Sequence, residues 1–284
     1  MSRMTRRFIT FGIITTALVA FGAAFGIHAF SDTLLQTTSG NSKTLTIAPE
    51  GDTDVDVDID GFANWALLDR SSGDIEGANL KETSTPQSMI KPWLVADYLR
   101  QAESDAPPLL DSASAAIRIS DDEAAQTIYE ELGEDASIER LISTCALTDT
   151  TVFPGRWSKT EMSVRDAARM GECVADGRAA GPWTKWLLNE MRHVRGSTAD
   201  EDQHATSGGG RWGIIDGLPA SLRDEVAIKN GWTRMADGDW DLNCLAIHDD
   251  WVLAIMMGYS GDRSLDYGAD RCRAITEQLF GSGA

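Results

Sequence analysis

The sequence predicts an α+β fold in which one antiparallel sheet is built from both ends of the chain. Three observations indicate this class. Two strand-like segments open the predicted domain, helical periodicity dominates its middle, and three strand-like segments with one helix close it. An apolar content of 42% is sufficient for a proper core. We therefore expect a folded domain over 62–281.

The opening strands are predicted at 65–69 and 74–79, and Ser71-Ser72-Gly73 forms the turn between them. In the helical middle, the segment 121–132 places its apolar residues on one face, and Gly133 ends it. The glycine run 208–210 is interpreted as a flexible loop. Helices are predicted at 88–102, 121–132, 137–144, 163–175 and 182–194.

The closing strands are predicted at 226–232, 240–248 and 251–259. Asp237-Gly238 and Asp249-Asp250 provide the turns of this meander. A last helix is predicted at 267–280, and it ends at Gly281.

The first thirty residues, 1–30, are predicted to be a signal or membrane anchor rather than part of the fold. Three arginines precede an uncharged run from Phe8 to Phe30, which would extend roughly 35 Å as a helix. Arginines before this run and acidic sequence after it place the domain outside the cytoplasm. Cleavage near Ile27-His28-Ala29 and a partial twin-arginine signal remain alternatives. Residues 31–61 are predicted to be an acidic, polar linker.

The charge of −19, from 25 basic and 44 acidic residues, argues against a nucleic-acid partner because phosphates would be repelled. Asp56, Asp58, Asp60 and Gly61 imitate the start of a calcium loop. Leu67, however, stands where such a loop has its bidentate glutamate, so a linker or short acidic strand is favoured. The four histidines show no metal-ligand spacing. The sequence therefore does not indicate a metal site.

The four cysteines are too far apart for a zinc ribbon. In an oxidising compartment two disulfides are the default, and three pairings are possible. We prefer Cys145–Cys173 and Cys244–Cys272, with buried free thiols as the alternative.

Three short motifs carry the functional signal. They are Ser88-Met89-Ile90-Lys91, Ser120-Asp121-Asp122 and Lys229-Asn230-Gly231, in that order. Each motif alone is weak: a Ser-x-x-Lys occurs roughly once by chance in such a chain, Ser-Asp-Asp is typical of a helix N-cap, and Lys-x-Gly is typical of a solvated strand end. Their order, and the absence of a second Ser-x-x-Lys or Lys-x-Gly in the sequence, favour a functional site.

The residue types in these motifs are those that open an amide without histidine. Ser88 and Lys91 share one face of a helical turn. Lys91 acts as a base only if burial and a second cation, Lys229, lower its pKa. Ser120 can then relay a proton to a leaving nitrogen, and Lys229 offers charge to a substrate carboxylate.

A developing oxyanion needs two hydrogen-bond donors. The backbone amides of Ser88 and Trp232 are predicted to supply them. Gly231 would let a substrate backbone lie close against its strand.

With these motifs the sequence resembles the penicillin-recognising serine enzymes, which include class A β-lactamases and D-alanyl-D-alanine peptidases. The resemblance covers about 62–281 and includes Leu218-Pro219, which leads into the segment 226–233. It implies a five-stranded antiparallel sheet with flanking helices and a helical subdomain. It also implies β-lactams or peptidoglycan stem peptides as substrates, and a reaction that needs no metal or organic cofactor.

The resemblance implies a role for each matched residue. Ser88 would be the nucleophile, Lys91 the base, Ser120 the proton shuttle and Lys229 the carboxylate anchor. Substrate-binding residues would be Asp122, Asn230, Gly231, Trp232 and Thr233.

Four departures from the family pattern modify this expectation. Asp122 replaces an asparagine and is expected to pair with Lys91, raising its pKa and weakening the base. The short stretch between Lys91 and Ser120 indicates a trimmed helical subdomain. Pro92 requires that the turn carrying Lys91 lie at a helix start or be distorted. The Glu-x-x-Leu-Asn segment of class A β-lactamases is missing, and Glu161 is interpreted as a helix-start residue.

The missing glutamate favours slow hydrolysis of a penicilloyl ester, since loss of a general base costs on the order of 10²–10⁴ in rate. A peptidase-like or unassigned serine hydrolase is therefore favoured over an efficient β-lactamase. Two alternatives remain. One is a non-catalytic module that binds cell-wall peptide or a protein partner, and the other is an esterase acting on an unrelated acyl group.

Overall fold

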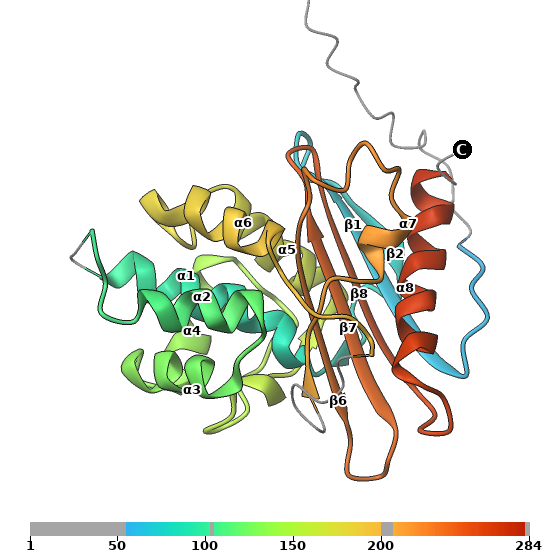
Figure 1. The fold of residues 1–284 in the computed structure, drawn as a ribbon, viewed down its shortest axis with the longest axis horizontal. Coiled ribbons are helices and arrows are strands. Elements are labelled where there is room, and N and C mark those ends of the chain that lie inside the picture. Colours follow the sequence, from blue (N-terminus) through green and yellow to red (C-terminus); the bar gives the residue numbers. More distant parts are fainter. Residues whose placement is uncertain (1–54, 103–104, 200–206, 282–284) are drawn as a thin grey trace, which may run out of the picture. The chain divides into compact units, whose positions relative to one another are not determined.

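The computed structural model describes residues 55–102, 105–199 and 207–281, and Figure 1 shows them in colour. The predicted anchor, 1–30, lies outside the described residues, as does most of the predicted linker. Within the described part of the chain, no helix has the length and apolar character needed to cross a membrane. Residues 55–60 lie along the last helix, where the amide of Asp56 donates to Gln278 Oε1 and Arg271 donates to the carbonyl of Asp58.

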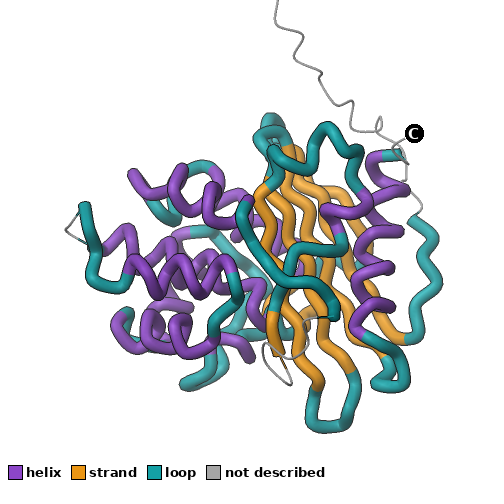
Figure 2. Tube along the Cα trace, in the orientation of Figure 1, coloured by secondary structure: helices purple, strands orange, loops and turns teal. Residues whose placement is uncertain are grey.

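One antiparallel sheet, in the order β2-β1-β8-β7-β6-β5, divides the fold into two sides (Figures 1 and 2). The five predicted strands are confirmed, and both ends of the chain contribute to the sheet as expected. A sixth strand, β5, adds two residues to the free edge of β6. The strands are β1 (Gly61–Asp69), β2 (Ile75–Ala78), β5 (Ser207–Gly208), β6 (Ala227–Arg234), β7 (Trp240–Ile247) and β8 (Trp251–Tyr259). A separate small pair joins β3 (Thr83–Ser84) to β4 (Met162–Ser163).

β5 corrects the interpretation of 208–210 as a flexible loop. Gly208 pairs with Trp232 of β6, and Gly208, Gly209 and Gly210 are all buried. The pairing uses backbone groups, so no side-chain alternation in the sequence indicates it.

Helices cover both faces of the sheet. On one face lie α8 (Leu265–Phe280), red in Figure 1, and the short α7 (Ile214–Gly217), orange in the same view. On the other face α5 (Val164–Ala175) packs directly on β1, β7 and β8. A β-carbon added at Gly171 would come within 2.6 Å of Val252 Cγ1, so glycine allows this helix to approach the strands closely.

The remaining helices form a lobe beside α5 (Figure 1). Four of them match predicted helices, although the first begins as a 3₁₀ turn, η1 (Gln87–Ile90). α2 was not predicted, because its sequence is rich in alanine and serine and buries only Ala113, Ala116 and Ile117. The helices are α1 (Lys91–Gln101), α2 (Leu110–Arg118), α3 (Asp122–Glu131), α4 (Asp135–Thr144) and α6 (Thr184–Arg192).

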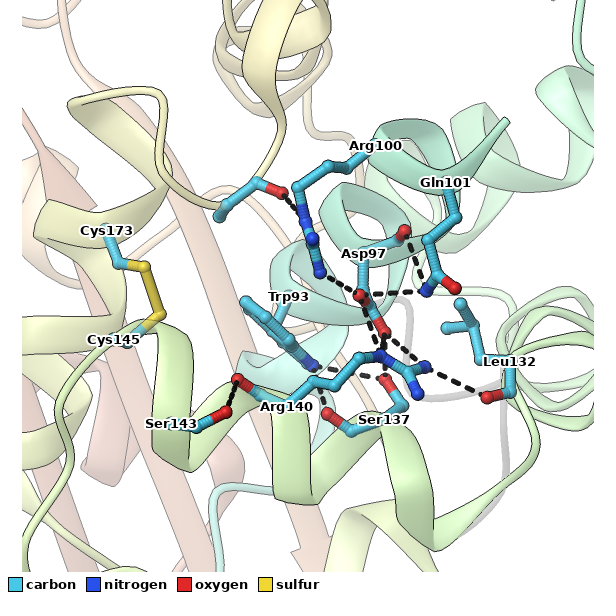
Figure 3. Close-up of polar contacts among 11 residues, drawn as sticks. Trp93, Asp97, Arg100, Gln101, Leu132, Ser137, Arg140, Ser143, Cys145 and Cys173 are labelled. Atoms are coloured by element: carbon cyan, nitrogen blue, oxygen red, sulfur yellow. Dashed lines mark hydrogen bonds and ion pairs between the residues drawn. A yellow bond between two sulfur atoms is a disulfide. The ribbon is translucent and has the colours of Figure 1, made fainter. Parts of the chain in front are cut away.

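A buried carboxylate joins α1 to α4 (Figure 3). Asp97 is fully buried, and its oxygens accept hydrogen bonds from Arg100, Arg140, Ser137 and Gln101. Two arginines therefore neutralise one buried charge, which is the condition under which burial of a carboxylate is tolerated.

Both preferred disulfides are confirmed. Cys145 at the end of α4 bonds to Cys173 of α5, and Cys244 of β7 bonds to Cys272 of α8. The first ties the helical lobe to α5, and the second ties the last helix to the sheet.

Candidate active site

The candidate nucleophile lies where the chain enters the helical lobe. Ser88 is in η1, directly before α1, and its carbonyl accepts the backbone N–H of Lys91. Pro92 occupies the first turn of α1, where its missing N–H costs nothing, as the sequence required. η1 packs against β6, and Ser88 is only 3% exposed. Gln87, the residue before Ser88, has a left-handed backbone (φ 52°), an unfavourable conformation for a non-glycine residue that recurs at functional sites.

The Lys91 ammonium group has all three of its hydrogens engaged. Lys91 Nζ donates to Asp122 Oδ1 at 2.5 Å, to the carbonyl of Ser120 at 2.5 Å and to Ser120 Oγ at 3.2 Å. The predicted pairing of Asp122 with Lys91 is therefore present. Burial lowers the pKa of Lys91, and the charge of Asp122 opposes that shift.

Lys229 approaches Ser120 from β6. Lys229 Nζ donates to Ser120 Oγ at 2.8 Å and lies 3.3 Å from the carbonyl of Asn230. Burial, and then the charge of Lys91, hold the pKa of Lys229 well below its usual range. Among the described residues no acidic side chain forms a salt bridge with Lys229.

Ser120 links the two lysines. It has a left-handed backbone (φ 57°) just before α3 and is 2% exposed. Its hydroxyl oxygen accepts from both lysines, so both lone pairs are used and its own proton remains to be donated. This arrangement suits a proton relay.

The opposite wall of the site is the face of β6 toward η1. A β-carbon added at Gly231 would lie 2.5 Å from the backbone nitrogens of both Ser88 and Met89, so only glycine fits this approach. Thr233 Oγ1 donates to Gln87 Oε1 at 2.8 Å, and Gln87 Nε2 donates to Thr85. Gln87 thus fixes the turn carrying Ser88 against β6, a role that the sequence did not indicate.

Asn230 and Trp232 contact neighbouring segments of the chain instead of the pocket beside Ser88. Asn230 is 1% exposed, and its amide donates to the carbonyls of Gly210 and Trp212 at 3.0 and 2.8 Å. Trp232 is buried, contacts the Trp240 ring and pairs with Gly208 through β5. In this state Asn230 holds a neighbouring chain segment rather than presenting its amide to a pocket.

Ser88 opens into a pocket of about 590 Å³ between α3 and the segment 155–158. Trp157 forms part of its wall, and its ring lies 5.3 Å from Lys91 Nζ, a cation–π distance. The indole of Trp157 also donates to Gln126 Oε1. The lining residues are Gln87, Ser88, Asp122, Glu123, Gln126, Thr127, Glu130, Gly155, Arg156, Trp157, Ser158 and Thr233.

Glu161 is not among the residues that line this pocket. It is exposed, and its backbone forms an isolated bridge with Thr151. It precedes β4 and the Ser163 cap of α5, so its placement agrees with a residue near a helix start.

The described fold was compared with known proteins. No protein-family model matches the sequence, and a sequence search among curated proteins finds no relative. Solved structures do match. A structure of L2 complexed with relebactam aligns with a TM-score of 0.59 at 15% identity, covering 77% of this chain and 90% of that one.

Two further structures give the same result. A β-lactamase from Xanthomonas campestris pv. campestris aligns with a TM-score of 0.58 at 16% identity, over 79% of this chain and 92% of that one. The ancestral GNCA class A β-lactamase aligns with a TM-score of 0.57 at 16% identity, over 78% and 94%. The chain has the class A β-lactamase fold. At such identities the likeness concerns the fold alone.

Proposed function

We propose that the protein is an acyl-transferring serine hydrolase that forms an ester on Ser88 with a β-lactam or a peptide ending in D-Ala-D-Ala. The observation that carries the proposal is the chain of hydrogen bonds Lys91–Ser120–Lys229, located where η1 meets β6. Three segments that are distant in the sequence bring these groups together. Burial of two lysines beside one serine hydroxyl is not needed to stabilise the fold, so it favours a functional role.

The proposed chemistry proceeds in two steps. Ser88 Oγ attacks the substrate carbonyl carbon while its proton passes to neutral Lys91. The amide C–N bond then breaks, and the leaving nitrogen receives a proton through Ser120. Water hydrolyses the resulting ester, which regenerates Ser88 and releases the acid.

Burial favours the acylation step, because it lowers the pKa values of both lysines and so favours the neutral form of the base. The deacylation step has less support. Glu161 lies outside the pocket that Ser88 lines, so the proposal expects a long-lived acyl-enzyme and a peptidase-like rather than β-lactamase-like enzyme.

A second candidate is a non-catalytic β-lactamase-fold module that binds cell-wall peptide or a protein partner. The ion pair between Lys91 and Asp122 favours it, since a protonated Lys91 cannot accept the proton of Ser88. This candidate predicts binding of the substrate without an ester on Ser88.

We also propose an extracytoplasmic location, with the N-terminal segment as the membrane anchor or secretion signal. The two disulfides support an oxidising compartment. Substrates in the cell wall would be consistent with that location.

The test uses a fluorescent penicillin with the wild-type domain and the variant Ser88→Ala. A stable label on wild type that the variant lacks supports the peptidase-like enzyme. Rapid turnover of a chromogenic cephalosporin would assign it instead to the β-lactamases. Binding of a D-Ala-D-Ala peptide with no label from any acylating reagent would favour the non-catalytic module.

A further inference from the structure

A short segment of the chain already occupies the edge of β6 beside the candidate site. Gly208–Trp212, which we call the strap, begins in β5 and runs antiparallel to β6. Gly208 pairs with Trp232, the residue after the Lys-Asn-Gly motif. An extended substrate that adds to a sheet edge uses the same backbone groups, so the strap and such a substrate compete for one place.

The strap also covers Lys229. A β-carbon added at Gly209 would lie 2.8 Å from Lys229 Nζ, 2.9 Å from the carbonyl of Asn230 and 3.0 Å from Ser120 Cβ. The backbone at Gly209 therefore packs directly on Lys229, the predicted carboxylate anchor, and on Ser120, the predicted proton shuttle. Lys229 is completely buried, and neither it nor Ser120 lines the pocket that Ser88 opens into.

Contacts on the side away from the reacting groups hold the strap in place. Asn230 Nδ2 donates to the carbonyls of Gly210 and Trp212. The Arg211 guanidinium donates to the carbonyls of Arg192 and Arg223, at 3.1 and 2.9 Å. The net contribution of each such hydrogen bond is modest, so a ligand that offers Lys229 a charged partner can replace them.

The buried amino group of Lys229 supplies the driving force for displacement. Its hydrogen-bond partners are a hydroxyl and a carbonyl, and no described carboxylate forms a salt bridge with it, although the charge of Asp122 acts on it from farther away. A substrate carboxylate in place of Gly209 would provide that neutralisation. The desolvation that now disfavours the charged form of Lys229 would then be offset.

The pocket beside Ser88 has the opposite electrostatic preference. The carboxylates of Glu123 and Glu130 line it together with one guanidinium, that of Arg156, while Asp122 is paired with Lys91. An anionic substrate is therefore disfavoured in this pocket as long as the strap covers Lys229.

We propose that the strap is an internal substitute for substrate, which keeps the carboxylate-binding half of the site closed until a carboxylate-bearing ligand displaces it. The described state then accepts uncharged acylating groups through the pocket of Trp157. Substrates that end in a carboxylate require the strap to leave β6. This inference rests on the proposed function of Ser88 and Lys229, but its test separates the two.

Arg211→Ala loosens the strap without placing any atom in the site. Its matched control is Arg234→Ala, because Arg234 also donates to two backbone carbonyls, those of Gly238 and Gly261, away from the strap. Gly208→Pro provides a second, independent opening by disturbing the pairing with Trp232. Each protein is labelled with a carboxylate-bearing fluorescent penicillin and with an uncharged fluorophosphonate.

The expected result is that Arg211→Ala and Gly208→Pro each raise the ratio of penicillin to fluorophosphonate labelling rates by about tenfold, the order of magnitude expected when strap hydrogen bonds are lost. Arg234→Ala should leave the ratio unchanged. An unchanged ratio in both strap variants, or an equal rise in the control, would overturn the strap proposal.

If the proposed function is wrong, neither reagent will label Ser88 in any variant, which is a different result from an unchanged ratio of labelling rates. Calorimetric titration with a D-Ala-D-Ala peptide then tests the strap, since binding does not depend on acylation. Tighter binding to Arg211→Ala than to wild type supports the strap, whereas equal affinities refute it.

Discussion

The substitution Asp122→Asn tests whether this carboxylate restrains the candidate base. Asp122 Oδ1 lies 2.5 Å from Lys91 Nζ, and the amide of asparagine keeps the size of the side chain while removing its charge. The charge of Asp122 opposes the lowering of the Lys91 pKa that burial causes. The Asp122 side chain is 37% exposed, so solvent screens this charge and keeps its effect modest.

The direction in which the pH profile moves follows from the protonation state that Lys91 needs in order to act as the base. Acylation requires neutral Lys91, so its rate rises with pH until the pH passes the pKa of Lys91. Without the charge of Asp122 that pKa falls further. The acid limb of the rate profile should therefore move to lower pH, with acylation faster by about tenfold or less along that limb. Above both pKa values the two rates should converge.

The assay is the second-order rate of Ser88 labelling by the fluorophosphonate between pH 5 and 10, followed for wild type and the variant. An uncharged reagent prevents the substrate's own charge from affecting the comparison. Glu123→Gln is the matched control, because Glu123 is the next acidic residue of α3 and is not among the hydrogen-bond or ion-pair partners of Lys91 in the described structure. The reasoning is refuted if Asp122→Asn is no faster at any pH, or if Glu123→Gln shifts the profile equally.

Three further predictions concern the framework around the site. Asp97→Asn should lower the free energy of unfolding by about 3 kcal/mol, because it leaves two partly exposed arginines without their shared buried carboxylate, and urea denaturation measures the change. Gly231→Ala should abolish labelling of the nucleophile and cost about 1–3 kcal/mol, since its β-carbon meets two backbone nitrogens at 2.5 Å; unchanged labelling would contradict the packing described. Replacing Cys244 and Cys272 together by alanine should cost about 3–4 kcal/mol, because the bond closes a loop of 28 residues, and thermal denaturation under non-reducing conditions should show a lower Tm.

Much of the fold could be predicted because its elements carry strong local signals. The meander 226–259 has apolar strands separated by Asp-Gly and Asp-Asp turns, and this part of the sheet is confirmed. The disulfides followed from the compartment implied by the N-terminal sequence. α2 was missed because alanine and serine give little periodic contrast, and few of its side chains are buried.

The candidate site was predicted in part. Ser-x-x-Lys and Lys-x-Gly are side-chain motifs, and the structure brings Lys91 and Lys229 to the same serine hydroxyl. The strap was missed because its contacts come from the backbone of three glycines, which leave no pattern of side chains. Trp157 was also not assigned to the site, since its position over Lys91 depends on how a distant loop folds.

The central claim is that Ser88 is a nucleophile activated by Lys91 and Ser120. Mass spectrometry of tryptic peptides after reaction with the fluorophosphonate tests it most directly. The account predicts one adduct, on the peptide that contains Ser88, and slower formation of that adduct in Lys91→Ala and Ser120→Ala. An adduct on another residue, or an adduct on Ser88 that forms at the same rate without Lys91, would contradict it.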